Sequence, residues 1–131
     1  MRVYLSHKIR GEKGLKATAT EMKENCDEAI KIANELREAL PGIEFYVPGE
    51  HEDFVQAAFY GGYLTEKEIL EIDCRIIDKC DAVMIYVPKG DEVQGGRGVE
   101  LDYAYNNNIR VCIVENVYEA IEWLAEMQIR G

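Results

Sequence analysis

Two carboxylates in this sequence stand where a carboxylate could take part in a reaction. Glu100 follows the glycine-rich segment 90–98 and falls in the first turn of an expected helix, which places its side chain at the mouth of a sheet. The alternative role there is an interaction with the helix dipole, which contributes roughly 0.3–1 kcal/mol. Asp73 lies between Ile69 and Ile76 on the apolar side of another expected helix. Because burying a carboxylate is costly, Asp73 either caps a neighbouring loop or belongs to a pocket.

Tyr4 adds a hydroxyl near the carboxyl end of an expected strand, where it is either a core residue or a contact for one of these carboxylates. Two carboxylates and a tyrosine beside a glycine-rich, arginine-bearing rim suit the cleavage of a glycosidic bond. One carboxylate would act as nucleophile or stabilise positive charge on the sugar, and another group would handle the proton of the leaving base. General acid catalysis of this kind contributes roughly 10²–10⁴ in rate.

Two loops have features of an anion-binding site. Segment 6–14 carries Lys8, Arg10 and Lys13, and segment 90–100 carries Arg97 among several glycines. Glycine lets backbone N–H groups approach a ligand, a helix N-terminus offers unpaired donors, and arginine forms charge-assisted bonds with phosphate. The second loop is neither a P-loop nor G-x-G-x-x-G, so a plain turn with solvated arginines is the alternative.

The elements that must position these residues alternate along the chain. Apolar runs predict strands at 2–6, 43–47, 82–87 and 109–114, and helical spacing of apolar residues predicts helices at 20–40, 66–79, 99–106 and 117–128. Thr65 and Glu68 have the spacing of a capping box. Segment 49–63 is either a short helix or a mobile active-site loop. We therefore expect one α/β domain over residues 1–131, a flavodoxin-like or Rossmann-like parallel sheet of about five strands with helices on both faces.

Composition narrows the classes of function. The chain has 131 residues, 47% of them hydrophobic, and a net charge of -10, which argues against binding to a nucleic acid polymer or an anionic membrane. An apolar run long enough for a membrane span or a signal peptide is missing from the sequence, so we expect a cytoplasmic protein. The four cysteines form no CxxC pair, which predicts reduced and mostly buried thiols, and nothing calls for a metal or a cofactor.

Three segments resemble one known family. They are Val3–Gly11, Asp73 followed by Asp81 at the start of an apolar strand, and Arg97–Ala104, which is similar to a Gly-x-Glu-Leu-Gly-x-Ala motif. Their order and spacing resemble the nucleoside 2-deoxyribosyltransferases and the related 2′-deoxynucleoside 5′-monophosphate N-glycosidases. The resemblance spans most of residues 1–114 and implies a single domain of that type.

The resemblance implies a role for each matching residue. Glu100 would be the nucleophile, Asp73 would assist the leaving base or hold the sugar, and Tyr4 would orient Glu100. Residues implied in binding substrate or its phosphate are Ser6, His7, Lys8, Ile9, Arg10, Gly11, Gln94, Gly96, Arg97 and Gly98. The chain departs from the family pattern at Asp102, where glycine is usual, at Gln94, where serine or a carboxylate is usual, and at His7 and Lys8, where small residues are usual.

The function expected from these features is an N-glycosidase that cleaves nucleoside or deoxynucleoside 5′-monophosphates through a glutamate nucleophile. The alternatives are a deoxyribosyltransferase that exchanges bases on deoxynucleosides, or a nucleotide-binding module of the same fold without catalysis. The expected partner is a small nucleotide or nucleoside. The resemblance also implies a homodimer or larger homo-oligomer, with the aromatic segment 54–63 as a contact or lid.

Overall fold

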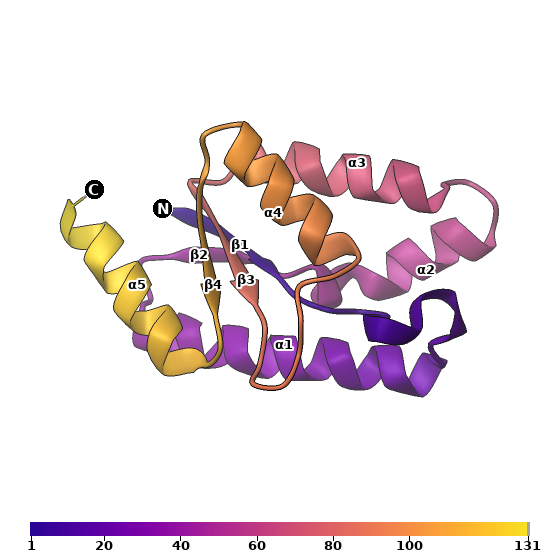
Figure 1. Ribbon diagram of the computed structural model, residues 1–131, viewed down its shortest axis with the longest axis horizontal. Coiled ribbons are helices and arrows are strands. Elements are labelled where there is room, and N and C mark those ends of the chain that lie inside the picture. Colours follow the sequence, from indigo (N-terminus) through magenta and orange to yellow (C-terminus); the bar gives the residue numbers. More distant parts are fainter. Residues whose placement is uncertain (131) are drawn as a thin grey trace.

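The computed structural model describes residues 1–130, in which strands and helices alternate (Figure 1). The strands are β1 (Arg2–Ser6), β2 (Glu44–Tyr46), β3 (Ala82–Tyr86) and β4 (Arg110–Val114). The α-helices are α1 (Ala19–Ala39), α2 (Glu52–Tyr60), α3 (Glu66–Ile77), α4 (Gly96–Asn106) and α5 (Val117–Arg130). Two 3₁₀ helices, η1 (Gly11–Lys16) and η2 (Pro48–His51), follow β1 and β2.

The sheet is parallel throughout, with the strand order β2-β1-β3-β4. This confirms the predicted α/β class with a parallel sheet. The predicted count of about five strands is wrong for residues 1–130, where the sheet has four. The four strands fall in the four segments whose apolar runs predicted strands, and the chain after β4 forms the predicted helix as α5, so no further segment of the described residues supplies a fifth strand. Strand β2 pairs with one edge of β1, and β3 pairs with the other edge. The strand order therefore reverses between β1 and β3, and parallel sheets of this kind bind ligands at the carboxyl ends of the strands at such a switch point.

Alternating side chains of the central strands pack into two separate apolar clusters, one on each face of the strand. Val3 and Leu5 of β1 pack in a cluster with residues of α1 and α5. Tyr4, between them, packs in a second cluster that includes Ile77 of α3 and Ala104 of α4. Successive side chains of a strand point to opposite faces, which explains the division. Figure 1 shows α1 and α5 on one side of the strands and α3 and α4 on the other.

Capping residues set where the helices begin. Thr18 forms a capping box with Glu21 at the start of α1, and Thr65 forms the predicted box with Glu68 at the start of α3. In each case a hydroxyl accepts from a backbone N–H that has no partner within its own helix. The helix predicted at 99–106 begins earlier, at Gly96, because Gly95 has a positive φ of 58° that turns the chain into α4.

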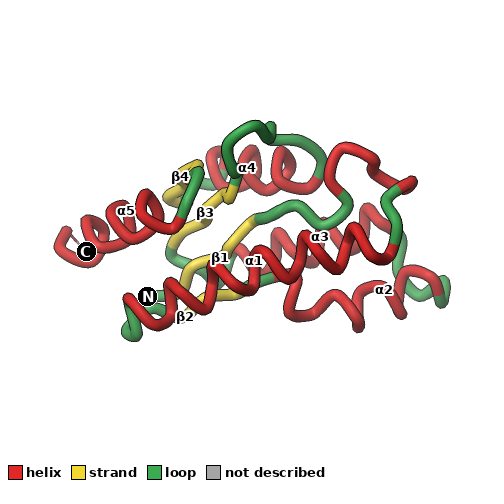
Figure 2. Tube along the Cα trace, turned by 90° about the horizontal axis from the view of Figure 1, so that it is seen from below, coloured by secondary structure: helices red, strands yellow, loops and turns green. Residues whose placement is uncertain are grey.

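Segment 49–63 is helical, which decides between the two expectations for it. Residues 48–51 form η2 and residues 52–60 form α2, which ends in a turn at Gly61 and Gly62. The N-terminus and the end of α5 lie at the opposite end of the molecule from α2 (Figures 1 and 2). Residues that follow β1 and residues of α2 line the same cavity, which is the candidate site.

The cysteines are free thiols, of which Cys26 and Cys80 are buried and Cys74 and Cys112 are half-buried. In residues 1–130, none of the helices has the length and apolar character needed to cross a membrane.

Candidate active site

Glu100 is buried at the carboxyl end of the sheet and is held by two hydroxyl groups. The Tyr4 hydroxyl donates to its Oε2 at 2.6 Å, and Ser6 Oγ donates to its Oε1 at 2.7 Å. Tyr4 and Ser6 are two apart on β1 and therefore share the strand face that carries α4. The Glu100 side chain is only 5% exposed. Both carboxylate oxygens are thus fixed in position by the central strand.

Burial and hydrogen bonding act in opposite directions on this carboxylate. Burial raises the pKa of Glu100 above its usual value of 4.5, and the bonds from Tyr4 and Ser6 offset only part of this rise by stabilising the charged form. The Tyr4 pKa is raised well above its usual value of 10.0, first by burial and then by the negative charge of Glu100. The tyrosine hydroxyl therefore keeps its proton and remains a hydrogen-bond donor to Glu100.

Asp73 on α3 is the second carboxylate of the site. Its pKa is raised from 3.8 to about 7, first by burial and then by the negative charges of Glu100 and Glu52. A carboxyl group with a pKa near neutrality can hold a proton and give it up, which is the property required of a general acid. The site therefore combines one carboxylate held by two hydroxyls with another poised for proton transfer.

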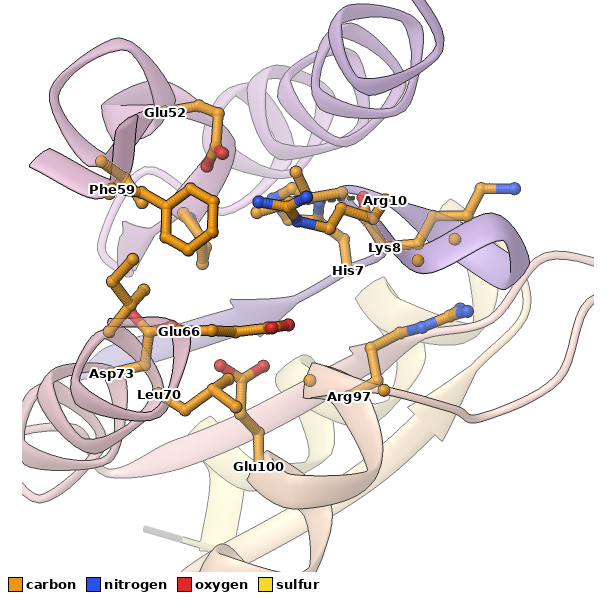
Figure 3. A pocket seen from close by; sticks show the side chains of 18 of the residues that line it. His7, Lys8, Arg10, Glu52, Phe59, Glu66, Leu70, Asp73, Arg97 and Glu100 are labelled. Atoms are coloured by element: carbon orange, nitrogen blue, oxygen red, sulfur yellow. Dashed lines mark hydrogen bonds between the residues drawn. The ribbon is translucent and has the colours of Figure 1, made fainter. Parts of the chain in front are cut away.

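A cavity of about 190 Å³ lies between these carboxylates and the opposite helix. Figure 3 shows Glu52 and Phe59 of α2 on one wall, Asp73 and Leu70 of α3 on another, and Glu100 of α4 beneath. The segment after β1 and the N-terminus of α4 complete the walls. The cavity thus opens at the β1/β3 switch point, where the strand order predicts a ligand.

Arg10 brings a positive charge into this cavity. Its guanidinium carbon lies 5.2 Å from the centre of the Phe59 ring, within the range of a cation–π interaction. In Figure 3 the Arg10 side chain points toward Phe59, whereas Lys8 extends in the other direction. Lys8 Nζ lies 3.8 Å from Asp91 Oδ2. Of the basic residues predicted in the first loop, Arg10 is therefore the better placed to meet an anionic ligand.

Arg97 lines the cavity but uses its terminal nitrogens within the fold. Its Nη1 donates to the Tyr86 carbonyl at 3.1 Å and to Asp91 Oδ2 at 2.9 Å, and its Nη2 donates to the Glu92 carbonyl at 2.9 Å. The side chain is 1% exposed. These bonds hold the loop after β3 against the end of β3, so the arginine shapes the rim of the site.

His7 joins the segment after β1 to the start of η2. Its Nε2 accepts from the Gly49 N–H at 3.0 Å, so its Nδ1 carries the proton and donates to the Lys8 carbonyl at 2.8 Å. Burial lowers the His7 pKa from 6.5 to about 4, so the ring is neutral. A Cβ at position 49 would lie 3.0 Å from His7 Cε1 and 3.1 Å from Cys26 Cβ, so glycine permits this close approach.

The structure brings most of the predicted site residues together. Those that line the cavity are His7, Lys8, Ile9, Arg10, Gly11, Asp73, Gln94, Gly96, Arg97 and Glu100. Tyr4 and Ser6 contact Glu100 from β1, where Ser6 is fully buried. Gly98 lies in the first turn of α4 and is not among the residues that line the cavity.

Segment 49–63 was expected as a short helix or an active-site loop, but none of its residues was predicted as a site residue. Glu52, Gln56 and Phe59 line the cavity, and Glu66 joins them from the start of α3. The usable signal was helical spacing: Glu52 and Gln56 are four apart, as are Val55 and Phe59, so each pair shares a helix face once 52–60 is recognised as a helix.

The described residues contain no group of three or more histidine, cysteine, aspartate or glutamate side chains arranged to hold a metal ion. The charged side chains that line the cavity are four carboxylates and three basic groups: Glu52, Glu66, Asp73, Glu100, Lys8, Arg10 and Arg97. No protein-family model, curated protein sequence or solved structure matches the chain.

Proposed function

We propose that this chain is an N-glycosidase that cleaves the bond between base and sugar in deoxynucleoside 5′-monophosphates. The observation that carries the proposal is the pairing of Glu100, held on both oxygens by Tyr4 and Ser6, with Asp73, whose pKa lies near 7, in one cavity. Such a pair supplies a nucleophile and a proton donor, which are the two groups that cleavage of a glycosidic bond requires.

The proposed reaction has two steps. In the first, a carboxylate oxygen of Glu100 bonds to C1′ of the sugar while the bond from C1′ to the base nitrogen breaks, and Asp73 gives its proton to the departing base. In the second, water attacks C1′ and breaks the ester to Glu100. The water proton passes to Asp73 and its hydroxyl remains on C1′. The products are the free base and the sugar 5-phosphate.

Two groups support the choice of a phosphorylated substrate. The Arg10 guanidinium lies over Phe59 at the cavity, where it could form charge-assisted bonds with a phosphate. Helix α4 begins at Gly96 without a side-chain cap, and although the Gly98 and Val99 N–H groups donate to the Gly95 carbonyl, the N-terminal end of a helix favours an anion. An anion at the mouth of the cavity would meet both groups.

The deciding experiment measures free base by chromatography after incubation with the four deoxynucleoside 5′-monophosphates and with the matching deoxynucleosides. We expect release from the monophosphates and loss of release in Glu100→Gln. The matched control is Asp102→Asn, which removes an exposed carboxylate from the same helix and keeps the activity. Absence of release from every compound would contradict the proposal.

A second arm separates hydrolysis from transfer. Free adenine is added as an acceptor to reactions on thymidine and on deoxythymidine 5′-monophosphate. Hydrolysis predicts sugar 5-phosphate with or without adenine, whereas formation of deoxyadenosine from thymidine would identify a deoxyribosyltransferase. A homo-oligomer remains a prediction, and light scattering coupled to size exclusion tests it.

A further inference from the structure

Glu52 is a carboxylate in the cavity that the proposed reaction does not use. It is the first residue of α2, is half-buried, and lines the cavity on a wall other than that of Glu100 (Figure 3). Glu66 also lines the cavity, but its side chain is exposed. Partial burial of a carboxylate is unfavourable unless the group has hydrogen-bond partners. The partners of Glu52 therefore indicate its role in the cavity.

Gln56, one turn further along α2, fixes the orientation of this carboxylate. Its Nε2 donates to Glu52 Oε1. The same orientation leaves the Gln56 Oε1 atom buried without a hydrogen-bond partner among the described residues. An unpaired buried carbonyl oxygen is destabilising, and such groups in folded proteins are few. Gln56 therefore orients the Glu52 carboxylate while its own amide oxygen stays without a hydrogen bond.

The position of Glu52 places it beside the leaving group of the proposed reaction. Glu52 and Asp73 line the same cavity from α2 and α3, and the negative charge of Glu52 is among the causes that raise the pKa of Asp73. Asp73 would protonate the departing base, so that base must lie within reach of Asp73. The walls nearby are apolar, with Val55, Phe59 and Leu70 lining the same cavity. A flat heteroaromatic ring fits between such side chains.

A carboxylate selects a ring edge by the donors that the edge presents. An ionised carboxylate only accepts hydrogen bonds, and its two oxygens retain lone pairs after one bond from Gln56. Guanine presents a ring N–H beside an exocyclic amine, so two adjacent donors face the two oxygens. Adenine and cytosine place an amine beside an unprotonated ring nitrogen, and thymine places its N–H between two carbonyls. In each of these, an acceptor would face the carboxylate.

We propose that Glu52 reads the base of the substrate and selects guanine, with Gln56 as the residue that positions its carboxylate. The inference rests on the proposed N-glycosidase function and adds its base specificity. Burial raises the pKa of Glu52, and the hydrogen bond from Gln56 and the positive charge of Arg10 oppose that shift by favouring the ionised form, which only accepts hydrogen bonds.

The test uses a series of 5′-monophosphates that differ by one donor. Hypoxanthine keeps the ring N–H of guanine and lacks the amine, whereas 2-aminopurine keeps the amine and lacks the ring N–H together with the 6-carbonyl. We expect kcat/KM for base release to be highest with deoxyguanosine 5′-monophosphate and about tenfold to a hundredfold lower with either analogue. The series uses the wild-type chain, so its result does not depend on whether a variant folds.

Variants then assign the discrimination to residues. Glu52→Gln replaces an acceptor with a donor at constant shape and is expected to lower the guanine-to-adenine ratio of kcat/KM about tenfold or more. Gln56→Met removes the positioning bond and is expected to lower the same ratio by less. The matched control is Asp53→Asn, which removes the neighbouring exposed charge from α2 and leaves the ratio unchanged.

Two results would overturn the inference and are distinguishable. If base is released but guanine is not preferred over both analogues, or if Glu52→Gln keeps the wild-type ratio, Glu52 does not read the base and the N-glycosidase function stands. If the wild-type chain releases base from none of the nucleotides, the proposed function is wrong and the inference is overturned with it.

Discussion

Glu100 and Glu52, the carboxylates on two walls of the cavity, differ in the hydrogen-bond partners around them. On the wall formed by β1 and α4, both oxygens of Glu100 accept hydrogen bonds from buried hydroxyls. On the wall formed by α2, Gln56 donates to Glu52 and leaves its own oxygen unpaired. A carboxylate with complete partners is fixed before substrate arrives, as catalysis requires. A wall with an unpaired group has bonds to gain from a ligand.

The largest effect should follow from removal of the Glu100 carboxylate. Glu100→Gln keeps the shape of the side chain and removes the nucleophile, so we expect kcat for base release to fall on the order of 10⁴-fold or more. A rapid-quench assay measures the residual rate. Near-normal activity would show that Glu100 and its two hydroxyl partners have a structural role alone, and the contrast between Glu100 and Glu52 would lose its functional meaning.

A smaller effect is expected at Asp73. Asp73→Asn removes the proton donor and should lower kcat roughly 10²–10⁴-fold. In the wild-type chain the donor must be protonated, so activity should decline as the pH rises through about 7, the pKa of Asp73. The variant should lose this basic limb in a pH–rate profile. Glu71→Gln, which changes an exposed carboxylate on the same helix, is the control and should keep the limb.

Tyr4→Phe tests whether the pairing of Glu100 matters in itself. A hydrogen bond to a charged group contributes about 1.5–3 kcal/mol, so we expect kcat to fall about tenfold to a hundredfold. Because the Tyr4 bond lowers the Glu100 pKa, its loss should also move the acidic limb of the pH–rate profile to higher pH. Tyr86→Phe, which removes a hydroxyl bonded to Glu28 outside the cavity, should change neither quantity. Equal behaviour of the two variants would contradict the assignment.

His7 connects the two walls, and its effect should appear in stability. The His7 pKa is about 4 in the folded chain and 6.5 as an ordinary value. Between these values the unfolded chain binds more protons, so the free energy of unfolding should fall as the pH drops from 6.5 toward 4, by no more than about 3 kcal/mol at 1.36 kcal/mol per pKa unit.

Urea denaturation across this pH range measures the effect. His7→Asn should be less stable at pH 7 and should show a smaller loss toward pH 4, whereas the same substitution at exposed His51 is the control and should keep the wild-type loss. A wild-type curve that is as flat as that of His7→Asn would contradict the role of His7.

Much of the fold was predictable because local patterns control it. Thr65 and Glu68 have the spacing of a capping box and form one, since each partner lies within one helical turn. The apolar run at 82–86 forms a fully buried central strand. The four segments with strand patterns all form strands, and the expected count of about five was wrong because it exceeded the number of such segments.

The site was predictable in part for a related reason. Glu100, Asp73 and Arg10 were marked by residue type and by place in the chain, and the structure brings all three to one cavity. The lining residues of α2 were not predicted because 49–63 lacks a clear apolar period, so its local sequence left a helix and an active-site loop as alternatives. Whether Arg97 faces the cavity or the loop after β3 also depends on partners, such as Asp91, that spacing alone does not reveal.

The amino-acid sequence by itself determined the alternation of strands and helices, the helix caps, and the residues able to act as nucleophile, proton donor or cation. These follow from side-chain type and from spacing within one or two turns. Only the tertiary structure decided that Tyr4 and Ser6 donate to Glu100, 96 and 94 residues away, and that Glu52 lies near enough to raise the Asp73 pKa. Hydrogen bonds and electrostatic shifts act over a few ångströms, and the parallel sheet brings these distant segments within that range.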